Sequence, residues 1–61
     1  MITRIKFPKN LKKEVYQALQ KSKKITRSYE IHNSVLYISS NDIEETEKVF
    51  DRLILNYKIL N

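Results

Sequence analysis

The amino-acid sequence contains no cysteine, no glycine and no tryptophan, and it has one proline and one histidine among its 61 residues. The lack of cysteine excludes disulfide bonds and thiolate metal sites, and the single His32 cannot form a histidine cluster. The lack of glycine excludes the glycine-rich loops that cradle phosphate groups. No nucleophile is paired with an activating base in the sequence. We therefore expect a protein that is not an enzyme and that holds no cofactor.

Long apolar runs are also missing. A helix needs about 20 mostly apolar residues to cross a bilayer, and no segment approaches that length. We therefore expect no membrane association, and the absence of cysteine fits a cytoplasmic location. A chain this short buries only about 60% of its unfolded surface, and without disulfides or metals it usually needs oligomerisation. The composition therefore predicts a partner.

The first half of the chain predicts a strand and a helix. Thr3, Ile5 and Phe7 alternate with basic residues, as in a half-buried strand. Pro8 ends this strand, because proline cannot donate to a ladder. Residues 11–21 then carry apolar side chains at one-face helical spacing, which predicts the first helix.

The second half predicts a hairpin followed by a long helix. Residues 25–31 alternate again, residues 35–38 are apolar on both faces, and Asn33-Ser34 can form the tight turn between these two strands. Residues 42–61 show helical spacing of apolar side chains. We therefore predict a single α+β domain over residues 1–61, in the order β-α-β-β-α, with a three-stranded antiparallel sheet and two helices packed on one face.

The predicted last helix carries more apolar surface than one small sheet can cover. Phe50 is the centre of its apolar face, and Val49 and Leu60 widen this face on one flank. Leu55 and Ile59 lie on the opposite side of the helix. We therefore predict that part of this helix docks against a helix of another chain. A frayed last turn with scattered exposed aliphatic residues is the alternative.

Positive charge is concentrated in the first half of the chain. Residues 1–30 hold nine Lys or Arg and two acids, or +7, whereas residues 31–61 hold three and five, or −2. The basic residues on or near the first helix are Lys9, Lys12, Lys13, Lys21, Lys23, Lys24 and Arg27. Such charges suit phosphate contacts, and an exposed Tyr37 on the sheet is a candidate for stacking on a base. A solvated lysine-rich face and a packing tyrosine are the alternative interpretations.

The sequence resembles the small dimerising subunit of the KEOPS complex along nearly its whole length. The resemblance is carried by Ile-Lys-Phe-Pro at 5–8, by Val-Tyr-Gln-Ala-Leu at 15–19, by the predicted hairpin strands at 25–31 and 35–38, and by the helix that opens at Asp42. In that family a strand ending near Phe-Pro leads into a helix with an Ala-Leu step, and a hairpin and a long helix follow.

The sequence departs from the family pattern in three places. Thr46-Glu47 stand where the family has Leu-Arg, and Asp51 stands where it has Asn. Asn33-Ser34 replace a turn that usually contains glycine. These differences suit a divergent paralogue that pairs with the standard small subunit.

The resemblance implies a non-catalytic assembly subunit. Members of the family dimerise by extending their sheets, so a homodimer or a heterodimer with a related small subunit is implied. Their helices pack against helices of the KEOPS catalytic subunit, and the complex makes threonylcarbamoyladenosine in tRNA. The implied docking positions in this chain are Val49, Leu53, Leu55, Ile59 and Leu60. The lysines of the first helix become candidate tRNA contacts.

Two other functions fit the same sequence. The first is a small basic nucleic-acid-binding protein of plasmid or viral type that acts independently, and its contacts would be Lys9, Lys12, Lys13, Lys23, Lys24 and Arg27. The second is an inhibitor or regulator that uses an edge strand to bind another protein. The assembly function needs the apolar last helix, whereas the nucleic-acid function needs the lysines.

Overall fold

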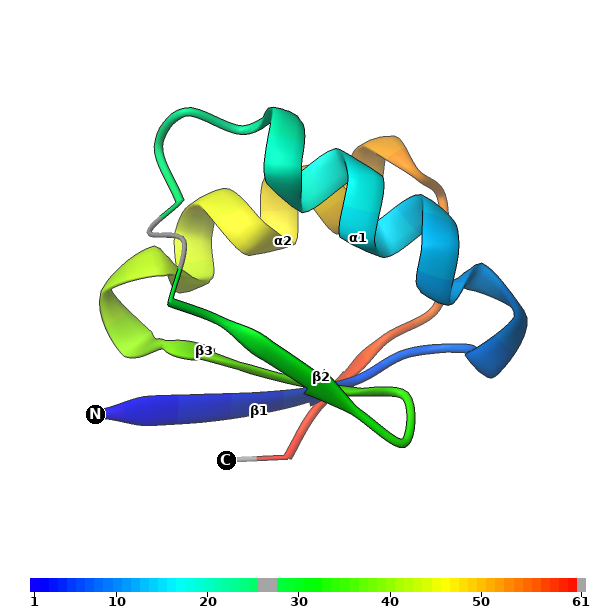
Figure 1. Ribbon diagram of the computed structural model, residues 1–61, viewed down its shortest axis with the longest axis horizontal. Helices are drawn as coiled ribbons and strands as arrows, with labels where there is room; N and C mark the ends of the chain where they lie inside the picture. The colour runs from blue at the N-terminus through cyan, green and yellow to red at the C-terminus, as the bar shows by residue number, and fades with distance from the viewer. Residues whose placement is uncertain (26–27, 61) are drawn as a thin grey trace.

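The computed structural model describes residues 1–25 and 28–60 (Figure 1). The described elements are β1 (Ile2–Lys6), η1 (Lys9–Leu11), α1 (Lys12–Lys21), β2 (Glu30–His32), β3 (Val35–Ser39), η2 (Ser40–Asp42), α2 (Ile43–Arg52) and β4 (Lys58–Ile59), where η marks a short 3₁₀ helix. The predicted α+β class is confirmed. The predicted count of three strands is wrong, because residues 58–59 form a fourth.

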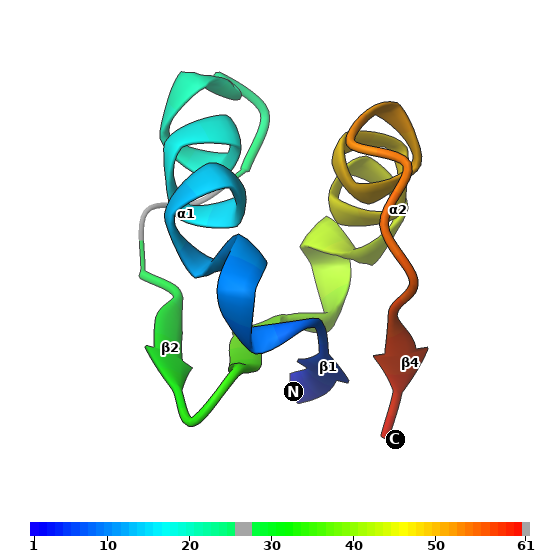
Figure 2. The same cartoon turned by 90° about the vertical axis from the view of Figure 1, so that its right-hand side faces the viewer.

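The four strands form one antiparallel sheet in the order β2-β3-β1-β4. β1 and β3 therefore lie in the centre, and β2 and β4 are the edges. The strands before and after each α-helix run parallel to one another with one strand between them, which makes two split βαβ units. Both helices lie on the same face of the sheet, and no described element covers the opposite face (Figures 1 and 2).

Alternating burial along the central strands defines the core. Thr3 and Ile5 of β1 are buried, whereas their neighbours in the strand are exposed. Leu36 and Ile38 of β3 are buried on the same face, because Leu36 pairs with Ile5 and Ile38 pairs with Thr3. Full burial of a large apolar side chain contributes about 1.5–3 kcal/mol. The core consists of Ile5, Phe7, Val15, Leu19, Ile25, Leu36, Ile38, Val49, Phe50 and Leu55.

The β2–β3 hairpin turns on the two residues predicted for it. Asn33 and Ser34 have positive φ angles of 51° and 65°. Positive φ at both central residues defines a type I′ turn, which matches the twist of the flanking strands. The backbone carbonyl of Ser34 accepts a hydrogen bond from the N–H of Phe7 at 3.0 Å, which ties the turn to the end of β1.

The start of α2 is fixed by side-chain hydrogen bonds. The Ser39 hydroxyl accepts a hydrogen bond from the Asn41 backbone N–H at 3.3 Å. Asp42 occupies the N-cap position of α2, but its side chain makes no capping bond there. Thr46 is fully buried, and its hydroxyl donates to the Asp42 carbonyl at 2.8 Å. This bond satisfies the one hydroxyl that α2 brings into the core.

The second helix is shorter than predicted, because α2 ends at Arg52. Ile54 has a left-handed φ of 53°, which an α-helix cannot continue through and which is unfavourable for a β-branched residue. The last turn is closed by hydrogen bonds from the Leu53 N–H to the Val49 carbonyl at 3.2 Å and from the Ile54 N–H to the Asp51 carbonyl at 3.1 Å. The chain then returns to the sheet (Figure 2).

The returning segment pairs with β1 as an edge strand. Residues 55–59 read Leu-Asn-Tyr-Lys-Ile, an alternation of apolar and polar side chains that is typical of a strand. In the observed register Ile59 lies opposite Ile5, and Lys58 lies opposite Lys6.

Ending the helix early allows three favourable contacts. Leu55 enters the core, and the Tyr57 ring packs edge-on against Phe50 with centroids 5.2 Å apart. The Leu60 N–H donates to the Arg4 carbonyl at 2.8 Å. A helix continued through this segment would leave Leu55 in solvent, so burial and strand pairing together offset the unfavourable Ile54 conformation.

Candidate functional site

The five residues predicted for docking do not share one helix face. Val49 and Leu55 are buried in the core at 7% and 8% exposure, and Leu53 packs partly buried against that core. Ile59 lies in β4 and Leu60 follows it, with 41% and 38% of their surfaces exposed. The predicted helix over residues 42–61 is therefore wrong beyond Arg52, and Leu55, Ile59 and Leu60 are not helical residues. A role for these residues in a protein interface stays a prediction.

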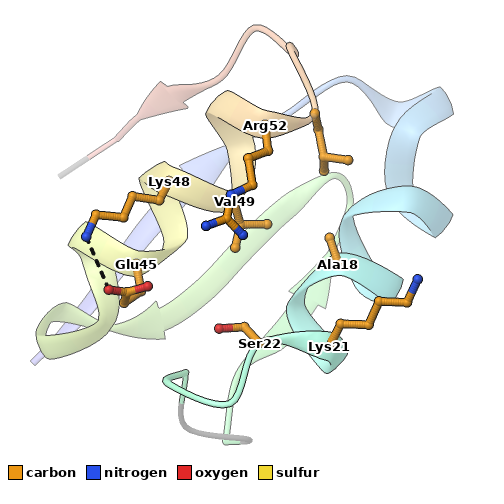
Figure 3. Close-up of a pocket in the computed structure, with 8 residues that line it drawn as sticks. Ala18, Lys21, Ser22, Glu45, Lys48, Val49 and Arg52 are labelled. Atoms are coloured by element: carbon orange, nitrogen blue, oxygen red, sulfur yellow. Dashed lines mark hydrogen bonds and ion pairs between the residues drawn. The ribbon is translucent and has the colours of Figure 1, made fainter.

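A groove of about 250 Å³ lies between α1 and α2 (Figure 3). Its lining residues are Ala18, Lys21, Ser22, Glu45, Lys48, Val49, Arg52 and Leu53. The groove exists because Ala18 of α1 and Ser22, which follows α1, are small and lie four positions apart. On the other side it is lined by the apolar side chains of Val49 of α2 and of Leu53, which follows α2. Two of the predicted docking residues therefore line one surface.

Charged side chains surround the apolar part of the groove. Lys21, Lys48 and Arg52 are cations, and Glu45 is the acid among the lining residues. The Glu45 carboxylate lies 3.4 Å from the Lys48 ammonium and 3.9 Å from that of Lys24. These charged side chains form the rim of the groove. Since one carboxylate, that of Glu45, is shared by two lysines, the rim keeps an excess of positive charge. It suits a partner with acidic side chains.

The described lysines that were predicted to contact nucleic acid are exposed at or beside α1. They are Lys9, Lys12, Lys13, Lys23 and Lys24. Lys24 forms the ion pair with Glu45, whereas Arg27 lies outside the described residues. These lysines belong to the helix layer of the molecule.

Tyr37 lies on the other side of the molecule from these lysines. Leu36 and Ile38 face the helices, so Tyr37 and Val35 face the open side of the sheet, as predicted. The Tyr37 ring packs edge-on against His32 with centroids 5.8 Å apart. Tyr37 and the described α1 lysines therefore lie on opposite sides of the sheet, and a role of either in nucleic-acid binding stays a prediction.

The basic residues that do share a face with Tyr37 come from β1 and β4. Arg4 and Lys6 are exposed and alternate with buried Ile5, and Lys58 lies opposite Lys6. The alternation of β1 in the sequence was sufficient to place Arg4 and Lys6 on the outer face. Lys58 was missed because the strand that carries it was predicted to be helix.

The pKa of the Tyr57 phenol is shifted from its ordinary value. Burial raises the pKa of its phenol above the ordinary value, and the negative charges of Asp51 and Glu47 raise it further. The phenol therefore stays neutral across the neutral pH range, in keeping with its packing against Phe50. Tyr57 therefore has a structural role, packed against the core beside Phe50.

Residues 1–25 and 28–60 were compared with the patterns of metal sites and of membrane-spanning helices. No three or more His, Asp or Glu side chains of this part lie together as a metal site. None of its helices has the length and apolar character needed to cross a membrane.

The fold defines the class of the protein as an α+β domain with the βαββαβ order of ferredoxin-like arrangements. Comparisons of the chain with protein-family models, with characterised proteins and with solved structures give no match. A shared fold does not define a function, so function is argued from the groove and the two faces of the sheet.

Proposed function

We propose that the chain is a non-catalytic assembly subunit that holds a helix of a partner protein in the groove between α1 and α2. The groove is the observation that supports the proposal, because it joins small side chains of α1 to apolar side chains of α2. A partner helix docks in such a groove by placing apolar residues at helical spacing against it.

The charges of the rim describe the partner helix further. The groove is lined by three cations, Lys21, Lys48 and Arg52, and by one acid, Glu45. A partner helix with Asp or Glu beside its apolar stripe complements this rim, and such complementarity speeds association and selects the partner. The partner is therefore expected to present an acidic amphipathic helix.

The family resemblance gives the proposal a specific form. The partner is then the catalytic subunit of a KEOPS-like complex that makes threonylcarbamoyladenosine in tRNA. Residues 53–60 do not lengthen the last helix, because α2 ends at Arg52. The groove supplies the helix-packing surface in place of a longer helix.

The edges of the sheet suit pairing with a second small subunit. β2 and β4 are the edge strands, and an edge strand can add a strand from another chain by backbone hydrogen bonds. A homodimer or a heterodimer with a related small subunit would extend the sheet in this way.

The test is co-purification of this chain with the KEOPS catalytic subunit and the standard small subunit of the same organism, followed by mass determination by light scattering. We expect a defined complex that survives high salt, because the contact is largely apolar. Ala18→Trp fills the groove and is expected to abolish the complex. Gln17→Trp adds the same ring at an exposed position of α1 and is expected to leave the complex intact.

Two results would contradict the proposal. One is a wild-type chain that elutes alone, as a monomer or homodimer. The other is a complex that persists in Ala18→Trp while circular dichroism shows a native fold. Leu55→Asp is unsuitable as a test, because Leu55 is in the core and its loss would unfold the chain.

A further inference from the structure

The open face of the sheet presents side chains that the groove does not use. In the strand register Arg4 of β1 lies opposite Tyr37 of β3, and Lys6 of β1 lies between Val35 of β3 and Lys58 of β4. Residues that pair directly across strands share one face. Three cations and one aromatic ring are therefore brought together on neighbouring strands.

Lys6 and Lys58 form a like-charge pair across two strands. Like charges directly opposite one another are unfavourable in a sheet. Neither ammonium forms a hydrogen bond or an ion pair with any side chain of the described residues. The acid of this face, Glu30, is bonded to His32 at 3.1 Å. A bound anion would relieve the repulsion between the two lysines.

The aromatic ring on this face has a defined position. Tyr37 belongs to a central strand, and its ring is held edge-on by His32 from the neighbouring strand β2. An aromatic ring on a sheet is a stacking platform for an unpaired base. The bases of a duplex are stacked on one another, so a ring in this position selects single strands.

A second apolar surface lies beside the lysine pair. A shallow hollow of about 300 Å³ is lined by Lys6, Phe7, Pro8, Asn56, Tyr57 and Lys58. The two lysines therefore border a partly apolar hollow. Phe7 belongs to the buried core and Tyr57 packs against it, so the stacking contact is assigned to Tyr37 alone.

We propose that the open face of the sheet binds single-stranded nucleic acid. Arg4, Lys6 and Lys58 contact backbone phosphates, and Tyr37 stacks on a base. Charge complementarity argues for this occupant over a neutral protein surface, and the ring argues for it over a simple polyanion.

The test uses fluorescence anisotropy with labelled oligouridine, oligodeoxythymidine and a DNA duplex of equal length. We expect both single strands to bind more tightly than the duplex, and a preference for one of them assigns RNA or DNA. Three phosphate contacts predict a log–log salt slope of about −2, or a roughly 20-fold loss of affinity between about 50 and 200 mM salt.

Matched variants locate the surface. Lys6→Ala with Lys58→Ala is expected to reduce the salt slope to about −0.7, the value for one remaining contact. Lys12→Ala with Lys13→Ala removes the same charge from α1 and is expected to leave the slope near −2.

Tyr37 variants separate stacking from charge. Tyr37→Leu is expected to weaken binding about 10-fold, whereas Tyr37→Phe keeps the ring and stays within about twofold. Circular dichroism melting of each variant verifies the fold.

The proposal is overturned if no single strand binds at low salt, or if the duplex or polyglutamate binds as tightly as the single strands. It is also overturned if the α1 double variant loses as much affinity as the sheet double variant, since the α1 lysines would then be the binding surface. A folded Tyr37→Leu with wild-type affinity contradicts the stacking contact.

Discussion

Replacing Ile54 by glycine is expected to stabilise the protein, although it removes a large apolar side chain. Ile54 is 92% exposed, so its side chain contributes almost no burial. Its backbone has a φ of 53°, and the left-handed region costs an L-residue about 1–2 kcal/mol. Glycine removes this strain but loses about 0.5–1 kcal/mol in backbone entropy. The expected net gain is about 0.5–1 kcal/mol.

The sign of the change in the free energy of unfolding distinguishes the observed end of α2 from a helix that continues through Ile54. If the helix ran through Ile54, glycine would lower the stability by about 0.5 kcal/mol, because its helix propensity is poorer. Ile54→Ala separates the two structures in a different way. It would stabilise a continued helix by a few tenths of a kcal/mol, but it keeps the Cβ that strains a left-handed residue and should change little here.

Thermal and urea unfolding followed by far-ultraviolet circular dichroism are the assays. A gain of 0.5–1 kcal/mol raises the Tm of a domain of this size by about 2–8 °C. The urea m-value should stay unchanged, since the same surface is exposed on unfolding. A lower Tm for Ile54→Gly together with a higher Tm for Ile54→Ala would refute the left-handed helix end and the return of the chain as β4.

Three further outcomes are expected. Ser34→Gly should raise the stability by about 0.5–1 kcal/mol in urea unfolding, because the second residue of the type I′ turn with Asn33 favours glycine; an unchanged midpoint would contradict the turn geometry. Phe50→Ala should cost about 3–5 kcal/mol, comparable with the whole stability of a small domain, and largely abolish the native circular dichroism signal. The raised pKa of Tyr57 means that its neutral form stabilises the fold fully below about pH 10, and that this contribution is lost as the pH rises through the raised value. Alkaline unfolding should therefore be less steep in Tyr57→Phe than in the wild type, and identical profiles would contradict this role.

The first part of the fold was predictable from local patterns. The alternation around Ile5 gave β1, helical spacing gave a first helix ending at Lys21, and Asn33-Ser34 gave the turn. These signals are unambiguous because each segment fits one period only. The burial of Val15 follows directly from that helical spacing.

The last part was not predictable in the same way, because two periods overlap there. Val49, Leu53 and Tyr57 fit a helical repeat, whereas Leu55, Tyr57 and Ile59 fit the alternation of a strand. The chain also lacks glycine, the usual signal of a helix end. The alternation was the signal that could have identified β4, and only tertiary pairing with β1 decides between the two patterns.

The candidate surfaces depended on that decision. Predicting the groove requires the relative placement of α1 and α2, which no sequence pattern gives. Predicting the pair of lysines on the open face of the sheet requires the register of β4 with β1. Lys6 was assignable to the outer face from β1 alone, but its like-charged neighbour was not.

The central position of β1 also affects how fast the chain folds. Both neighbours of β1 are distant in sequence, since Thr3 pairs with Ile38 and Ile5 pairs with Ile59. A long loop must close before either ladder forms, and its entropy is lost before any hydrogen bond is gained. Such non-local pairing slows folding relative to helical bundles of similar size. The β2–β3 hairpin is the local exception, so it is the part of the sheet that can form while β1 is still unpaired.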